Sequence, residues 1–190
     1  MTARVACAVL RARLHAQRRM LIAACAAAIA AGLLAPPGPA GIVLFCTLLG
    51  IGFALAQSPG LHPHLDRCEQ SAPLFGRELA RAKALVPCVA VTLATSIYAV
   101  AQLSRGAFDT YALLVALPAV VTATLVAISA TMRGGASRAL YVLLAVAASA
   151  GAYAIGVVGH SLLGELAFCV IVAFFAVRQY GETLARYDPI

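Results

Sequence analysis

The sequence contains few charged residues, and this scarcity excludes a water-soluble fold. Charged residues make up 11% of the chain and hydrophobic residues 63%, with a mean hydropathy of +0.94. Soluble domains are roughly half apolar and a quarter charged. Long apolar runs recur along all 190 residues, so no separate soluble domain has room to form. We therefore expect a single all-α transmembrane domain covering residues 1–190.

The sequence also lacks the motifs that would identify an enzyme or a metal site. The cysteines are scattered without a CxxC pair, which favours small buried thiols over a disulfide or metal framework. His62 and His64 form a close histidine pair, but a pair alone is a weak metal signal. No HExxH motif and no Ser/His/Asp arrangement is present. We therefore predict no enzymatic activity and assign no catalytic, cofactor-binding or metal-binding residues; a membrane-embedded enzyme is the weakest of the classes considered.

Six apolar stretches have the length of membrane spans, since a helix needs about 20 apolar residues to cross the hydrocarbon core. Each stretch is bounded by charge, proline or glycine. The first connection, from Ala35 to Pro39, contains three prolines and cannot continue a helix. The predicted spans are approximately 20–36, 40–57, 84–103, 110–132, 139–158 and 161–177.

The basic residues predict the orientation of these spans. Cytoplasmic loops of membrane proteins carry an excess of Lys and Arg. With six crossings and a cytoplasmic N-terminus, Arg105 is the only one of the fourteen basic residues in an outer loop. This distribution predicts a multi-pass protein of the cell membrane, with the bacterial cytoplasmic membrane favoured and both termini cytoplasmic. It also explains the net charge of +7 without nucleic acid as a partner.

Residues 4–19, which precede the first span, have the pattern of an amphipathic helix in the membrane interface. At 100° per residue, most of the basic side chains share one face and apolar side chains fill the rest; Arg13 alone breaks the pattern. Such a helix would direct its arginines toward lipid phosphates. The alternative is a plain basic flank that only sets the orientation.

The cytoplasmic loop 58–83 is the longest polar segment of the chain. Ser71 is a candidate N-cap and Pro73 lies in the first turn of a short amphipathic helix that would end at Lys83. Such a helix could dock a soluble partner, or it could be a solvated linker resting on the bilayer. The candidate contact residues are Pro73, Leu74, Phe75, Arg77, Glu78, Leu79, Arg81 and Lys83.

Glu165 is the one acidic residue well inside an apolar run, and we expect it in the outer half of the membrane. An ionisable group there is costly unless it is paired, wetted or neutralised, so a functional role is one interpretation. His160, near the outer rim, is a candidate partner. The other interpretation is that residues 156–164 form a partly re-entrant, water-exposed turn in which Glu165 faces solvent.

This organisation resembles the type-2 ABC exporter permeases, which include the B subunit of the haem exporter. The resemblance lies in the basic segment from Arg4 to Arg19, the six spans, and the strings Asp66-Arg67-Cys68-Glu69, Ala72-Pro73-Leu74 and Glu78-Leu79-Ala80-Arg81-Ala82-Lys83. In that family the loop between spans two and three carries a coupling helix that docks on an ATPase. Family members usually also have a re-entrant hairpin between spans five and six, for which only residues 156–165 are available here.

The resemblance implies a permease subunit that is driven by another chain. A Walker A loop needs Gly-Lys-Ser/Thr, and the sole lysine, Lys83, follows Ala82 outside any glycine-rich loop. The expected partners are a separate P-loop ATPase, a second identical or different permease subunit, and the lipid bilayer. The alternative function is a non-transporting membrane scaffold or anchor of a larger complex.

Overall fold

The structure is a computed structural model that describes residues 2–36, 38–70, 76–106 and 109–185. Over these residues the chain is helical and contains no strand. The elements are α1 (Thr2–Ala16), α2 (Arg18–Leu34), α3 (Pro39–Leu55), α4 (Pro63–Gln70), α5 (Gly76–Ser104), α6 (Thr110–Ile128), α7 (Gly135–Tyr153), the π-helical η1 (Ala154–Val158) and α8 (Leu162–Ala185).

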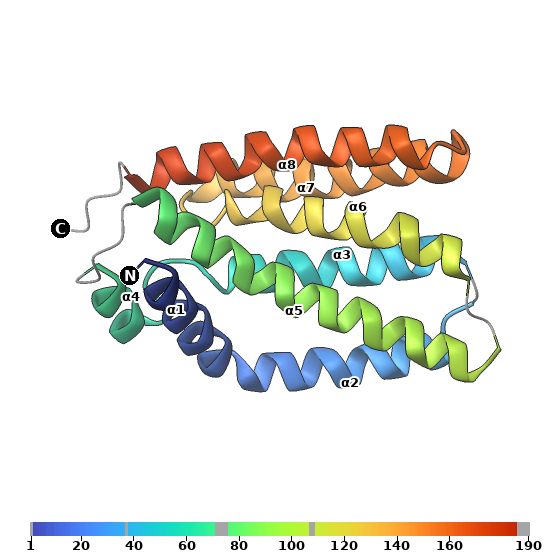
Figure 1. The fold of residues 1–190 in the computed structure, drawn as a ribbon, viewed down its shortest axis with the longest axis horizontal. Helices are drawn as coiled ribbons and strands as arrows, with labels where there is room; N and C mark the ends of the chain where they lie inside the picture. Colours follow the sequence, from blue (N-terminus) through green and yellow to red (C-terminus); the bar gives the residue numbers. More distant parts are fainter. Residues whose placement is uncertain (1, 37, 71–75, 107–108, 186–190) are drawn as a thin grey trace.

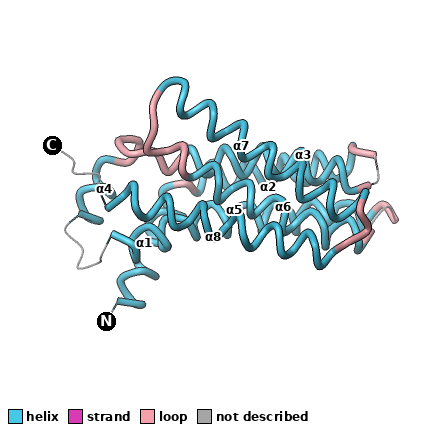
Figure 2. Tube along the Cα trace, turned by 90° about the horizontal axis from the view of Figure 1, so that it is seen from above, coloured by secondary structure: helices cyan, strands magenta, loops and turns pink. Residues whose placement is uncertain are grey.

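The long helices lie side by side and form an elongated bundle (Figure 1). α6 packs against α3, α5, α7 and α8, while α2 packs mainly against α5. The short helices α1 and α4 lie at one end of the bundle, together with the C-terminal end of α8 (Figure 1). We call this end the α1/α4 end. The N-terminal half of α7 diverges from the other helices (Figure 2), and residues 136–140 are exposed.

Four helices are long and apolar enough to cross a membrane, namely Leu79–Ser104, Thr110–Ile128, Gly135–Val158 and Leu162–Leu184. The count rises to five if α1 and α2, which meet at a bend of 69°, are taken as one span. α3 is also apolar but has only 17 residues. The predicted all-α fold is therefore confirmed over the described residues, and its apolar helices are those of a membrane-embedded protein. The six-span count remains a prediction.

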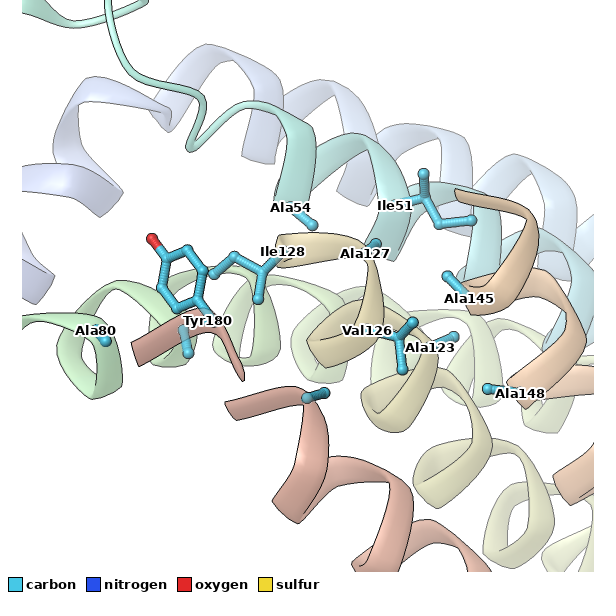
Figure 3. Close-up of a cluster of buried hydrophobic side chains, with 12 residues drawn as sticks. Ile51, Ala54, Ala80, Ala123, Val126, Ala127, Ile128, Ala145, Ala148 and Tyr180 are labelled. Atoms are coloured by element: carbon cyan, nitrogen blue, oxygen red, sulfur yellow. The ribbon is translucent and has the colours of Figure 1, made fainter. Parts of the chain in front are cut away.

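Small side chains allow the helices to approach closely. One core cluster joins α3, α5, α6, α7 and α8 through many alanines, around the larger side chains of Ile51, Ile128 and Tyr180 (Figure 3). Gly32 of α2 faces α5 so closely that an added Cβ atom would lie 2.7 Å from the Tyr98 carbonyl oxygen. Such contacts are typical of membrane bundles, where small residues bring helix backbones together. The helix packing is thus fixed by shape more than by polar contacts.

Polar contacts between the spanning helices are sparse among the described residues. The Thr47 and Ser149 hydroxyls hydrogen-bond at 2.8 Å and connect α3 to α7. By contrast, the Thr95 hydroxyl donates to the Val91 carbonyl of its own helix at 2.8 Å. A polar residue inside an apolar helix therefore does not by itself indicate a contact with a neighbouring helix.

Candidate functional site

The short helix α4 provides the first part of the candidate site, because it interrupts the connection between α3 and α5. Pro63 occupies its first turn, where the missing N–H of proline costs no hydrogen bond. Asp66 also lies in the first turn, where a negative charge is favoured by the helix dipole. The sequence had instead predicted a separate short helix that begins near Pro73. Pro63, followed three residues later by Asp66, is the signal in the sequence that could have predicted α4.

Asp66 connects three helices. Its Oδ1 atom accepts a hydrogen bond from Arg13 of α1 at 2.5 Å and lies 3.7 Å from the Nζ atom of Lys83 in α5. Its Oδ2 atom accepts a hydrogen bond from the Gly60 amide at 2.9 Å. We call Arg13, Asp66 and Lys83 the ionic cluster. The Arg13 side chain is 0% exposed, so this residue breaks the amphipathic pattern of α1 because it faces the protein and not lipid or water.

The Gly60 amide and the ionic cluster together lower the pKa of the Asp66 carboxyl. Partial burial by itself raises this pKa, because it disfavours the charged carboxylate. The hydrogen bonds from the Gly60 amide and Arg13, together with the charges of Arg13 and Lys83, outweigh burial. Asp66 is therefore ionised at neutral pH, and its negative charge offsets part of the positive charge of its two partners.

Two glutamine side chains extend this polar region beyond the ionic cluster. Gln17, between α1 and α2, donates from Nε2 to the carbonyl oxygen of Ala56 at 3.3 Å. Gln57, just after α3, is 1% exposed, and its amide atoms have no hydrogen-bond partner within the described structure. Gln17 thus connects the start of α2 to the end of α3, where Gln57 adds a second buried amide.

The predicted coupling segment has a different helical organisation from the one expected. Its beginning, including Pro73, Leu74 and Phe75, lies outside the described residues. Residues 76–83 are not a separate short helix but the first turns of α5. Pro87 lies inside α5 one turn after Lys83 and cannot donate to the Lys83 carbonyl, but the helix continues through it, so the charged segment and the span belong to one helix.

The individual candidate residues in these turns have different environments. Arg77 and Glu78 lie within α5, but their side chains are outside the described part. Leu79 is half-buried and Arg81 is exposed. Lys83, expected at the docking surface, is instead buried in the ionic cluster. The structure therefore leaves Arg81 accessible to a partner and gives Lys83 an internal role.

An open groove of about 850 Å³ separates α1 from the start of α4. Its lining combines apolar side chains with Arg11, His15, His62 and His64. The described residues contain no group of three or more His, Cys, Asp or Glu side chains that could hold a metal ion. The His62 and His64 pair therefore belongs to a mixed apolar and basic surface at the α1/α4 end.

Glu165 lies in the first turn of α8, at the opposite end of the bundle. Its side chain is 0% exposed, and neither carboxyl oxygen has a hydrogen-bond partner in the described structure. The interpretation in which Glu165 faces solvent on an exposed turn is therefore wrong: the turn is exposed at Gly159 and His160, but α8 directs Glu165 into the bundle. His160, with a φ of 47°, does not hydrogen-bond to Glu165.

Comparisons with protein-family models, with curated proteins and with solved structures find no match.

Proposed function

We propose that the chain is the transmembrane permease subunit of an ABC-type exporter, with six crossings and both termini in the cytoplasm. A separate P-loop ATPase would supply the energy, and a second permease subunit would complete the pathway. The proposal combines the family resemblance of the sequence with the arrangement of the α1/α4 end.

The distribution of charge along the bundle supports this topology. Arg105 follows α5 at the end of the bundle opposite α1 and α4. Ten other basic side chains of the described residues belong to the α1/α4 end, namely Arg11, Arg13, Arg18, Arg19, Arg67, Arg81, Lys83, Arg133, Arg138 and Arg178. Cytoplasmic segments carry such an excess. α2 and α3 have 17 residues each, which gives about 26 Å at 1.5 Å per residue. A bilayer can thin locally around spans of this length.

The ionic cluster is the observation that carries the proposal. A permease that uses a separate ATPase needs a cytoplasmic element whose movement reaches the spanning helices. Asp66 binds Arg13 and Lys83, and so ties α4 to α1 and to the first turns of α5. Since α5 runs through Pro87 into its span as one helix, a displacement of α4 would be passed to a spanning helix.

A pull-down from detergent extract tests the proposal. Tagged wild type should bring down a nucleotide-binding ATPase, and the double variant Arg67→Ala with Arg81→Ala should lose most of it. Both side chains are exposed near α4 and the start of α5, so their removal affects a docking surface and not the core. Arg18→Ala, an exposed substitution in α2, is the matched control and should retain the ATPase.

The result also separates the two functional classes. If intact wild-type bundle brings down no nucleotide-binding protein, the exporter proposal is overturned and the scaffold alternative replaces it. If the double variant retains as much ATPase as Arg18→Ala retains, the docking surface lies elsewhere and the role assigned to the α4 region is wrong.

A further inference from the structure

Glu165 is a buried carboxyl group at the end of the bundle opposite α1 and α4. Leu163 and Leu166, which lie within two residues of it in the sequence, are exposed on the outer surface of α8, while Glu165 itself is 0% exposed. Neither of its carboxyl oxygens has a hydrogen-bond partner among the described residues. The carboxyl group therefore points into the protein without the donors that normally accompany a buried carboxylate.

The protein provides space for this carboxyl group through Gly156. A Cβ atom added at Gly156 would lie 2.3 Å from the Oε2 atom of Glu165 and 3.0 Å from the Cγ1 atom of Val115. Any side chain at position 156 would thus collide with the carboxyl group. Gly156 belongs to η1, a π-helical segment at the end of α7. Such segments occur frequently at functional sites, where they interrupt regular helix geometry.

The groups that face Glu165 include no cation that could stabilise its charged form. From α6, the Tyr111 hydroxyl donates to the carbonyl oxygen of Gly156 and not to Glu165. From α8 itself, the buried thiol of Cys169 lies one helical turn after Glu165. No described Arg, Lys or His forms an ion pair with Glu165. The surroundings therefore offer neutral groups only.

The charge state follows from these surroundings. Transfer of an ionised carboxylate into a closed apolar site without a partner costs far more than transfer of the neutral acid. A metal cation would require additional oxygen ligands, since such ions normally take six or more. The Gly156 carbonyl already accepts a hydrogen bond from Tyr111. Of the available ligands, a proton is the one that the geometry accommodates.

We propose that Glu165 is a proton-binding site, occupied in this closed form of the bundle and emptied only when the corner between η1 and α8 opens to water. Protonation neutralises the carboxyl group in the closed state, and opening would hydrate the carboxylate and release the proton. This inference does not rest on the exporter proposal, because it concerns the opposite end of the bundle and makes no use of an ATPase.

Infrared spectroscopy of the full chain in lipid nanodiscs tests the proposal directly. At neutral pH a glutamate in water is ionised, whereas wild type should show the carbonyl-stretch band of a neutral carboxylic acid. Glu165→Gln, a neutral substitution of nearly the same shape, should abolish this band. Asp109→Asn and Glu182→Gln change exposed carboxylates and should leave it unchanged. Circular dichroism of each variant shows whether the bundle is folded.

The same measurement shows whether the site is sealed. In D2O the band should shift slowly, because exchange of the proton requires the corner to open. Absence of the band in folded wild type, or its retention in Glu165→Gln, would overturn the proposal. An immediate shift in D2O would disprove the closed site. Loss of the band on addition of sodium at constant pH would show that the carboxylate holds a metal ion instead of a proton.

Discussion

At the scale of single residues, Arg13 shows how a misfit in a sequence pattern can mark a tertiary contact. The amphipathic pattern of residues 4–19 leaves Arg13 on the wrong face, and the structure explains this by burial of its side chain against Asp66. A buried ion pair is not automatically stabilising, because desolvation offsets much of the attraction between the charges. Removal of one partner is nevertheless costly, since it leaves the other charge buried.

Asp66→Asn should therefore destabilise the α1/α4 end, by about 3 kcal/mol on the scale of broken buried pairs. The lowered pKa of Asp66 predicts the pH dependence of this contribution. It is fully present above the unfolded-state pKa of about 3.9 and is lost as pH falls through the lower pKa of the folded state. Amide hydrogen exchange of α1, compared between wild type and Asp66→Asn over this acidic range, measures the effect.

Glu182→Gln is the control for this prediction. Glu182 pairs with Arg178 at 3.0 Å on the exposed surface of α8, and an exposed pair of this kind contributes about 0.5 kcal/mol or less. If the α1 amides of the Asp66→Asn variant exchange no faster than those of wild type at neutral pH, the ionic cluster does not stabilise the α1/α4 end.

At the scale of helices, the close contact between α2 and α5 depends on the absence of a side chain at Gly32. An added Cβ atom would lie 2.7 Å from the Tyr98 carbonyl oxygen and 2.8 Å from the Cβ atom of Ala101. The first atom belongs to the backbone, and the second is a Cβ atom, whose position is fixed by the backbone, so neither can rotate away. Gly32→Ala should therefore separate the two helices and cost about 1–3 kcal/mol, the range for overpacked cores.

Thermal unfolding in detergent measures this cost, with Gly52→Ala as the matched control. At Gly52 in α3 the nearest atom to an added Cβ is the flexible Met20 methyl, at 3.5 Å. That substitution should be neutral or should stabilise by up to about 1 kcal/mol through helix propensity. Equal unfolding temperatures for the two variants would show that α2 and α5 do not pack as closely as described.

At the scale of the whole molecule, the arrangement of the helices predicts the sidedness of the chain. Arg105 and Arg138 lie at opposite ends of the bundle, and both side chains are exposed. In a cysteine-free background of intact cells, a membrane-impermeant thiol reagent should label Arg105→Cys from outside. Arg138→Cys should react only after the membrane has been opened. The reverse pattern would invert the proposed orientation. If both cysteines are labelled from the same side, α6, the helix between the two positions, does not cross the membrane.

The sequence by itself determined the fold class and the approximate positions of the long helices. An apolar run of sufficient length satisfies its backbone hydrogen bonds within one helix, so length and composition are enough to place it. The three prolines between Ala35 and Pro39 likewise end α2 without help from any neighbour. Glu165 could be singled out for the same reason, because one carboxylate in an apolar run is visible without coordinates.

Only the tertiary structure decided which polar residues meet. Asp66 and Lys83 are separated along the chain, and Arg13 is further still, so no local rule relates their charges before α1, α4 and α5 pack together. The orientation of Glu165 depends on the register of α8 against η1 and on the missing side chain of Gly156. Local periodicity determines that a helix forms, but the faces it buries depend on the shapes of its neighbours.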